Sequence, residues 1–169
     1  MAILKLELQD LAATERFGQF LSKGLVAGDV IALQGPLGAG KSALARALIS
    51  KLCPYETDIP SPTFTLVQTY DMPDGTPLWH FDLYRIETHH DAIELGIEDA
   101  FLDAVCLIEW PERLGILLPD SCLTIHFNPE ADALDNPMMR QVEITAPARW
   151  DRRLADLATL FDKSGAQGL

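Results

Sequence analysis

The first half of the chain alternates between helical spacing of apolar residues and short continuous apolar runs. After a cap at Thr14, apolar positions recur three or four residues apart, which predicts a helix that buries Phe17, Phe20, Leu21 and Leu25. A Gly-Asp turn then leads into the run 30–33, which is typical of a buried strand. Residues 42–52 are rich in good helix formers and stop before Pro54, so they predict a second helix.

The second half repeats this pattern with more strands, which are expected at 65–70, 78–83, 105–109, 121–127 and 140–145. A short helix is expected near 91–103. A terminal amphipathic helix carries Trp150, Leu154, Leu157, Ala158 and Phe161. Because helices alternate with strands, we expect an α/β fold, with a single domain and a mixed, mostly parallel sheet flanked by helices.

Length and composition fit one globular domain. The 169 residues are 48% hydrophobic and 22% charged, which is too apolar for a disordered chain and too interrupted by charge for a membrane span. We expect the domain to cover residues 1–162 and the polar residues 163–169 to form a flexible tail. Three cysteines without C-x-x-C spacing, and the lack of a secretory signal, indicate reduced thiols and a cytoplasmic protein.

The chain is acidic, and its negative charge is concentrated in one segment. The formal net charge is -12, which argues against tight binding to bare nucleic acid because that affinity comes from neutralising phosphates. Residues 71–135 carry 15 acidic and two basic side chains. Two interpretations of this acidic face stay open: a solvated surface, or a docking site for a basic partner.

Residues 35–42 form a phosphate-binding loop, here called the P-loop. The sequence GPLGAGKS satisfies G-x-x-x-x-G-K-[ST] and lies between the expected strand 30–33 and the expected helix 42–52, as the motif requires. Its three glycines permit backbone conformations that turn successive N–H groups toward a triphosphate. Lys41 would reach the β- and γ-phosphates, and the Ser42 hydroxyl would bind Mg²⁺.

Mg²⁺ at such a loop needs an acidic group at the end of a neighbouring buried strand. Glu109 follows four apolar residues and is the preferred direct or water-mediated Mg²⁺ group. Asp82 follows a less uniform run and is a candidate to orient or deprotonate the attacking water. The two assignments are interchangeable at this point, and a solvated carboxylate at the end of a strand is the alternative for either residue.

Two prolines stiffen the segment 59–65, which carries three hydroxyl groups between the P-loop and the acidic residues. In nucleotide switches, a hydroxyl in such a segment binds Mg²⁺ or a phosphate oxygen only when the triphosphate is present. Thr63 is the candidate sensor. The alternative is that the prolines only stiffen the entry into a strand.

The absence of a guanine-binding motif predicts which base the nucleotide carries. No [NT]-K-x-D motif, which reads guanine, occurs in the chain, and Lys163 is the only lysine after residue 51. We therefore expect ATP rather than GTP. The predicted catalytic residues are Lys41, Thr63, Asp82 and Glu109.

Five blocks of the sequence, taken in order, resemble one family closely. They are GPLGAGKS at 35–42, SPTFTLV at 61–67, HFDLYR at 80–85, ELGIED at 94–99 and IEWPER at 108–113. The chain resembles the TsaE family of bacterial ATPases over roughly residues 8–127. The resemblance implies a small P-loop ATPase required for the N6-threonylcarbamoyl modification of adenosine 37 in tRNAs that read codons beginning with A.

The resemblance also implies partners. Members of the family bind the heterodimer of TsaD, which transfers the threonylcarbamoyl group, and TsaB, its non-catalytic paralogue. ATP hydrolysis is expected to reset that complex between turnovers. The implied protein is an accessory subunit that meets tRNA only through its partners and does not associate with a membrane, which agrees with the acidic middle segment.

Position by position, the resemblance also assigns a site. Trp110 would lie near the nucleotide or, equally well, plug the core, while Thr14 would lie near the adenine and Arg140 near the nucleotide. The chain departs from the family's usual pattern at Ser42, which replaces Thr and keeps the hydroxyl, and at Pro36, which replaces Asp and removes one N–H. The implied nucleotide-binding residues are Gly35, Gly38, Ala39, Gly40, Lys41, Ser42, Thr14, Trp110 and Arg140, with Ser42 and Glu109 as Mg²⁺ ligands.

Two other functions would use the same features. A small-metabolite kinase would share the P-loop, but such kinases need arginines on a lid, and only Arg85 and Arg113 lie between positions 47 and 139. A nucleotide-gated binding module with negligible catalysis would fit the acidic face.

Overall fold

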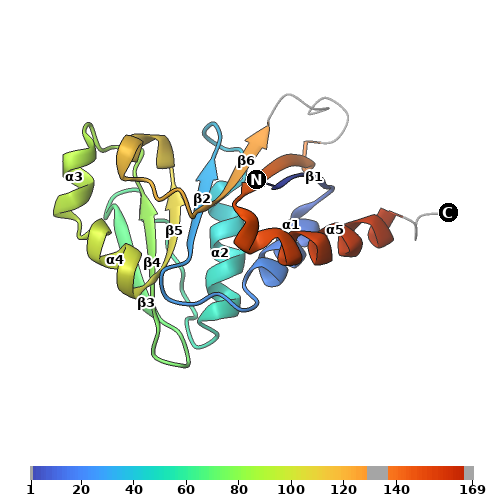
Figure 1. Ribbon diagram of the computed structural model, residues 1–169, viewed down its shortest axis with the longest axis horizontal. Helices are drawn as coiled ribbons and strands as arrows, with labels where there is room; N and C mark the ends of the chain where they lie inside the picture. The colour runs from blue at the N-terminus through green and yellow to red at the C-terminus, as the bar shows by residue number, and fades with distance from the viewer. Residues whose placement is uncertain (1, 129–136, 166–169) are drawn as a thin grey trace.

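The computed structural model describes residues 2–128 and 137–165. Its strands are Ala2–Leu8 (β1), Val30–Gln34 (β2), Val67–Asp71 (β3), Pro77–Asp82 (β4), Val105–Glu109 (β5), Leu123–Asn128 (β6) and Arg140–Ala146 (β7). They form one seven-stranded sheet in the order β1-β7-β6-β2-β5-β4-β3 (Figure 1).

Parallel pairing is confined to the middle of the sheet. β6, β2, β5 and β4 pair in parallel, whereas β1 with β7, β6 with β7 and β3 with β4 pair antiparallel. Central parallel strands are covered on both faces, which explains why the runs 30–33 and 105–108 are continuously apolar. The predicted mixed sheet is confirmed, with its parallel part at the centre and antiparallel strands at both edges.

Helices cover both faces of the sheet, and two hydrophobic clusters show which helix covers which face. The helices are Leu11–Leu21 (α1), Lys41–Leu52 (α2), His89–Glu94 (α3), Ile97–Asp103 (α4) and Asp151–Gly165 (α5), with 3₁₀ turns at Pro111–Leu117 (η1) and Ala148–Trp150 (η2). Side chains of α1, α2 and α5 pack with one set of alternating strand residues, and those of α4 and η1 pack with the other.

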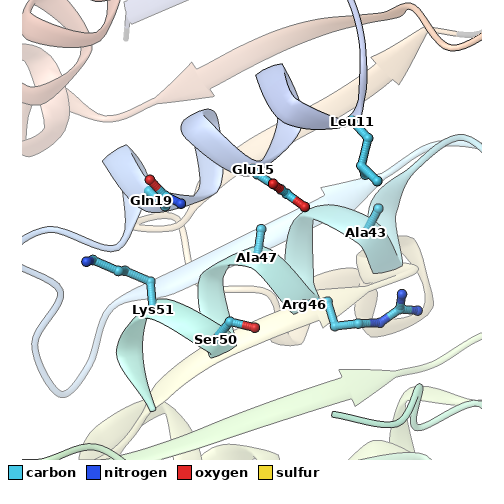
Figure 2. A pocket seen from close by; sticks show the side chains of 8 residues that line it. All are labelled: Leu11, Glu15, Gln19, Ala43, Arg46, Ala47, Ser50 and Lys51. Atoms are coloured by element: carbon cyan, nitrogen blue, oxygen red, sulfur yellow. The ribbon is translucent and has the colours of Figure 1, made fainter. Parts of the chain in front are cut away.

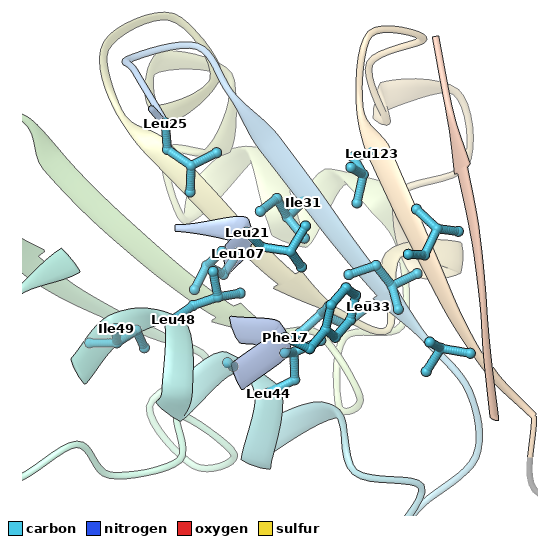
Figure 3. Close-up of a cluster of buried hydrophobic side chains, with 14 of the residues drawn as sticks. Phe17, Leu21, Leu25, Ile31, Leu33, Leu44, Leu48, Ile49, Leu107 and Leu123 are labelled. Atoms are coloured by element: carbon cyan, nitrogen blue, oxygen red, sulfur yellow. The ribbon is translucent and has the colours of Figure 1, made fainter. Parts of the chain in front are cut away.

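The larger cluster lies between α1, α2 and the sheet (Figure 3). Phe17 of α1 and Leu44 of α2 pack there against Ile31 and Leu33 of β2. The two helices approach closely at Gly18, where an added Cβ would lie 2.7 Å from the Cβ of Ala47. This packing fixes α2, and therefore the P-loop before it, against the central strands.

The C-terminal elements are anchored around Trp150, which is buried. Its Nε1 donates to the carbonyl oxygen of Ser121 at 3.3 Å, and the guanidinium groups of Arg149 and Arg153 lie 5.0 and 4.7 Å from its ring centre. Arg149 also forms an ion pair with Asp29 at 3.0 Å. These contacts join α5 to the turns that precede β2 and β6.

Besides shifts of one or two residues at the ends of several elements, the structure differs from the sequence-based expectations in larger ways. β1 is missing from the predicted elements. The predicted cap at Thr14 is wrong, because α1 begins at Leu11 and the carboxylate of Asp10 accepts a hydrogen bond from the N–H of Ala13 at 2.7 Å. The helix expected near 91–103 is divided into α3 and α4 by Gly96, whose φ angle of 83° lies in the left-handed region.

At the C-terminus, α5 continues to Gly165, and residues 166–169 of the expected tail lie outside the described residues. Within the part of the chain that the structure describes, no helix has both the length and the apolar character needed to cross a membrane. The domain boundary at residue 162 and the cytoplasmic location stay predictions.

Candidate nucleotide-binding site

The P-loop joins β2 to α2 at the carboxyl ends of the parallel strands. Gly35, Gly38 and Gly40 have φ angles of 142°, 76° and 109°. A Cβ at Gly35 would lie 2.9 Å from Phe127 of β6. The close approach of β6 therefore leaves room only for glycine at this position. The loop ends at the N-terminus of α2, where free N–H groups and the helix dipole favour an anion.

Lys41 is the first residue of α2, and its side chain turns back over the loop. Its Nζ donates to the carbonyl oxygens of Gly35 and Pro36 at 2.7 Å each and lies 4.2 Å from the centre of the Trp110 ring. Burial lowers the pKa of Lys41 below its usual range, although nearby carboxylates, above all that of Glu109, oppose the shift. A buried cation beside a loop of N–H groups is suited to a polyanion.

Ser42 and Glu109 meet where α2 begins and β5 ends. Ser42 Oγ donates to Glu109 Oε2 at 2.8 Å, and Glu109 Oε1 lies 2.9 Å from His80 Nε2. Glu109 and His80 are each only 2% exposed. A hydroxyl and a carboxylate side by side are oxygen donors of the kind that Mg²⁺ prefers, so these two residues fit the predicted ion.

Asp82 ends β4 and contacts the segment that carries the predicted sensor. Its Oδ2 accepts a hydrogen bond from Thr63 Oγ1 at 3.1 Å, and its Oδ1 accepts one from the N–H of Tyr84 at 3.1 Å. Thr63 Oγ1 lies 2.8 Å from Ser61 Oγ. β3 begins only at Val67, so Thr63 lies in a loop beside Asp82 and not in a strand.

These groups line one cavity of about 380 Å³, here called the P-loop cavity. Gly35 is not part of its lining, and neither is Thr14, whose buried hydroxyl donates to the carbonyl oxygen of Asp10 at 3.3 Å. All the other predicted site residues line the cavity: Gly38, Ala39, Gly40, Lys41, Ser42, Thr63, Asp82, Glu109, Trp110 and Arg140.

Trp110 and Arg140 lie on the wall of the cavity. Trp110 follows β5 with φ 60° and ψ 50°, and its ring centre is 4.9 Å from that of Tyr84. The indole therefore covers Lys41 and also packs partly against the core, and its place near the nucleotide stays a prediction. The Nε of Arg140 lies 3.5 Å from where a Cβ on Gly40 would be, so Arg140 lies beside the loop. A contact between Arg140 and the nucleotide stays a prediction.

Sequence reasoning missed several residues near these groups. Among them are Leu11, Tyr84 and Met138, which line the P-loop cavity, and His80, which contacts Glu109. His80 and Tyr84 belong to the block HFDLYR, and Leu11 directly follows the capping Asp10, so these three had a signal in the sequence. Nothing in the sequence pattern pointed to Met138.

A second hollow of about 290 Å³, here called the interhelical groove, lies between α1 and α2 (Figure 2). Leu11 and Ala43 line both hollows. The charged residues of the groove are Glu15, Arg46 and Lys51, and all three are exposed.

Several known proteins resemble this chain. The family profile described as "Threonylcarbamoyl adenosine biosynthesis protein TsaE" matches residues 8–140. The tRNA threonylcarbamoyladenosine biosynthesis protein TsaE of Rickettsia conorii is 37% identical over 123 residues, which cover 73% of this chain and 67% of that protein. The protein of the same description from Haemophilus influenzae is 34% identical over 116 residues, covering 68% and 72% of the two chains.

Among solved structures, the crystal structure of Bacillus subtilis YdiB matches with a TM-score of 0.73 at 27% sequence identity. The match covers 94% of this chain and 95% of that chain. It confirms the predicted P-loop NTPase-like α/β fold. By the extent of the profile match and the identity to its relatives, the chain belongs to the TsaE family.

Proposed function

We propose that this chain is a Mg²⁺-dependent ATPase in tRNA threonylcarbamoyladenosine biosynthesis, and that its hydrolysis of ATP resets a TsaD–TsaB complex between turnovers. The observation that carries the proposal is the 2.8 Å contact between Ser42 and Glu109 at the mouth of the P-loop, with Asp82 in the same cavity. Membership of the TsaE family supports the role in biosynthesis.

The nucleotide would be held by the loop and by Lys41. The ammonium group, which now donates to the carbonyl oxygens of Gly35 and Pro36, would donate to phosphate oxygens instead. Ser42 and Glu109 would hold Mg²⁺, which when bound neutralises charge on the β- and γ-phosphates.

The surroundings of the two carboxylates support a division of labour that the sequence leaves open. Both oxygens of Glu109 are engaged by groups of the protein, Ser42 and His80, which fixes its orientation for a metal. Asp82 is bonded to the hydroxyl of Thr63, in a loop, and faces the P-loop cavity. We therefore assign Asp82 to the attacking water and Thr63 to sensing the γ-phosphate.

The charge of the chain supports an indirect relation to tRNA. With a net charge of -12, the protein has little capacity to neutralise RNA phosphates, so partner proteins would hold the substrate RNA. In this proposal the chain supplies the nucleotide cycle, and TsaD and TsaB supply the RNA site and the group transfer.

The experiment that tests the proposal measures ATP hydrolysis and tRNA modification with and without the TsaD–TsaB heterodimer. We expect slow hydrolysis by the isolated chain, faster hydrolysis in the complex, and loss of both activities with Lys41→Ala or Glu109→Ala. Equal activity of these variants and the wild type in the complex would contradict the proposal.

Two further readouts separate the alternative functions. If γ-labelled phosphate appears on a small acceptor and not as free phosphate, the chain is a kinase. If Glu109→Gln still supports modification while partner affinity depends on ATP versus ADP, the chain is a binding module without a catalytic role.

A further inference from the structure

We infer that His80 is a positioning residue for the proposed Mg²⁺ site, in which its Nε2–H holds Glu109 Oε1 and so keeps Oε2 turned toward Ser42. The inference rests on the proposed role of Glu109 as a metal ligand. It extends the site by one residue from the neighbouring strand.

The strand register brings the histidine to this position. Leu78, His80 and Asp82 alternate along β4, and Leu78 packs in the cluster beneath α2, so all three point to the α2 face. Asp82 pairs with Glu109 in β5, and His80 pairs two residues earlier, with Leu107. From there the ring reaches diagonally to Glu109, with 2.9 Å between Nε2 and Oε1.

The hydrogen bonds of the ring point to a purpose beyond packing. An ionised carboxylate only accepts hydrogen bonds, so the proton of this contact lies on Nε2. Nδ1 is buried and has no hydrogen-bond partner among residues 2–128 and 137–165. An unpaired buried polar atom lowers stability, a cost that an apolar side chain would avoid at this core position. The benefit that offsets the cost is the contact with Glu109.

This contact divides the two oxygens of the carboxylate between two tasks. Oε1 is held by His80, and Oε2, which accepts from Ser42, faces the start of α2 and the P-loop cavity. Without the ring, Glu109 would lose a donor in a buried position and could rotate away from Ser42. Removing such a supporting partner of a metal ligand typically weakens metal affinity or activity by about 10–100-fold.

A matched pair of amide variants tests the inference. His80→Gln places an N–H close to the position of Nε2, whereas His80→Asn is too short to reach Glu109. With nucleotide at saturation, we expect Asn to weaken the apparent Mg²⁺ affinity by about 10–100-fold and Gln to stay within about threefold of the wild type. Calorimetric titration with MgCl₂, at a temperature where each protein is folded, measures this, and ATP binding in EDTA should be alike in all three proteins.

Two outcomes of the titration would overturn the inference: unchanged Mg²⁺ affinity in the Asn variant, or equal losses in both variants, which would mean that the ring only fills space. ¹⁵N chemical shifts of the His80 ring in the wild type provide a measurement that needs no variant to fold. We expect a protonated Nε2 and a bare Nδ1, and the opposite tautomer would contradict the proposed contact. Failure of the wild type to bind Mg-ATP would contradict the proposed function instead, and the ring tautomer would still decide the contact between His80 and Glu109.

Discussion

The P-loop cavity and the interhelical groove are neighbours that share Leu11 and Ala43, yet they are built differently. In the P-loop cavity, Lys41 and Glu109 are buried and held in place. Lys41 contacts two carbonyl oxygens and an indole ring, and Glu109 contacts a hydroxyl and an imidazole. In the groove, the charged side chains project from exposed helix surfaces (Figure 2). Both regions are hollow, so what distinguishes the P-loop cavity is that its polar groups are held in a fixed orientation.

The largest expected contrast between the two hollows concerns their lysines. Lys41→Met removes the cation but keeps an unbranched stem, and we expect the affinity for Mg-ATP to fall by about 1,000-fold, because about 4 kcal/mol from two charge-assisted hydrogen bonds is lost. The matched variant Lys51→Met in the groove should change the affinity less than about twofold, because an exposed charge contributes little. Calorimetry measures both, and similar losses would show that the groove takes part in nucleotide binding.

The carboxylates give the next contrast, in rate and not in affinity. Asp82→Asn should lower the rate of phosphate release in a single turnover by about 100-fold while ATP binding stays within about threefold, because an amide cannot accept a proton from water. Glu15→Gln in the groove serves as the control and should leave both quantities unchanged. A normal rate in Asp82→Asn would remove this residue from the proposed mechanism.

A pH titration sharpens the comparison further. Burial lowers the pKa of Lys41, and phosphates would raise it again, so above the pKa of the free protein binding requires uptake of a proton. Affinity for Mg-ATP should therefore be independent of pH while Lys41 is protonated. Above the pKa of Lys41, which lies below the ordinary lysine value of 10.5, the affinity should fall by about tenfold per pH unit. Lys41→Arg should abolish this alkaline loss, because arginine keeps its charge. The same loss in the Arg variant would assign it to another group.

The smallest functional effect is expected where the two helices touch beneath the groove. Gly18→Val would bring a branched side chain against Ala47, whose Cβ lies 2.7 Å from the position of an added Cβ, and should destabilise the fold by about 2 kcal/mol. Mg-ATP affinity at a temperature where the variant is folded should stay within about twofold of the wild type. Denaturant unfolding checks the first value, and combining the change with Ala47→Gly should recover part of the stability. A large loss of affinity would mean that the P-loop depends on this contact.

Much of the site was predictable because its parts follow one another in the sequence. The run 30–33, the P-loop and the helix after it form one local unit, and the motif specifies their order. Glu109 was predictable from the four apolar residues before it, since a buried parallel strand ends at the edge where the loop lies.

The rest depended on contacts between distant segments. The role of His80 requires the register of β4 on β5, which a hydrophobic pattern does not give. β1 is stabilised by pairing with β7, more than 130 residues away, so its own sequence gave a weak signal. Thr14 was chosen as a cap although Asp10, the better acceptor, precedes the first helical turn, and that choice placed the helix start four residues too late.

The family profile ends at residue 140, where β7 begins. Among the described strands, β7 is the only neighbour of β1 in the sheet, and Arg153 of α5 donates to the carbonyl oxygens of Leu21 and Lys23 at the end of α1. A chain that ended at the end of the profile would lack both β7 and α5. β1 would then have lost its neighbour in the sheet, and Phe17 would have lost its ring contact with Phe161. Protein prepared for binding studies should therefore retain the chain through α5.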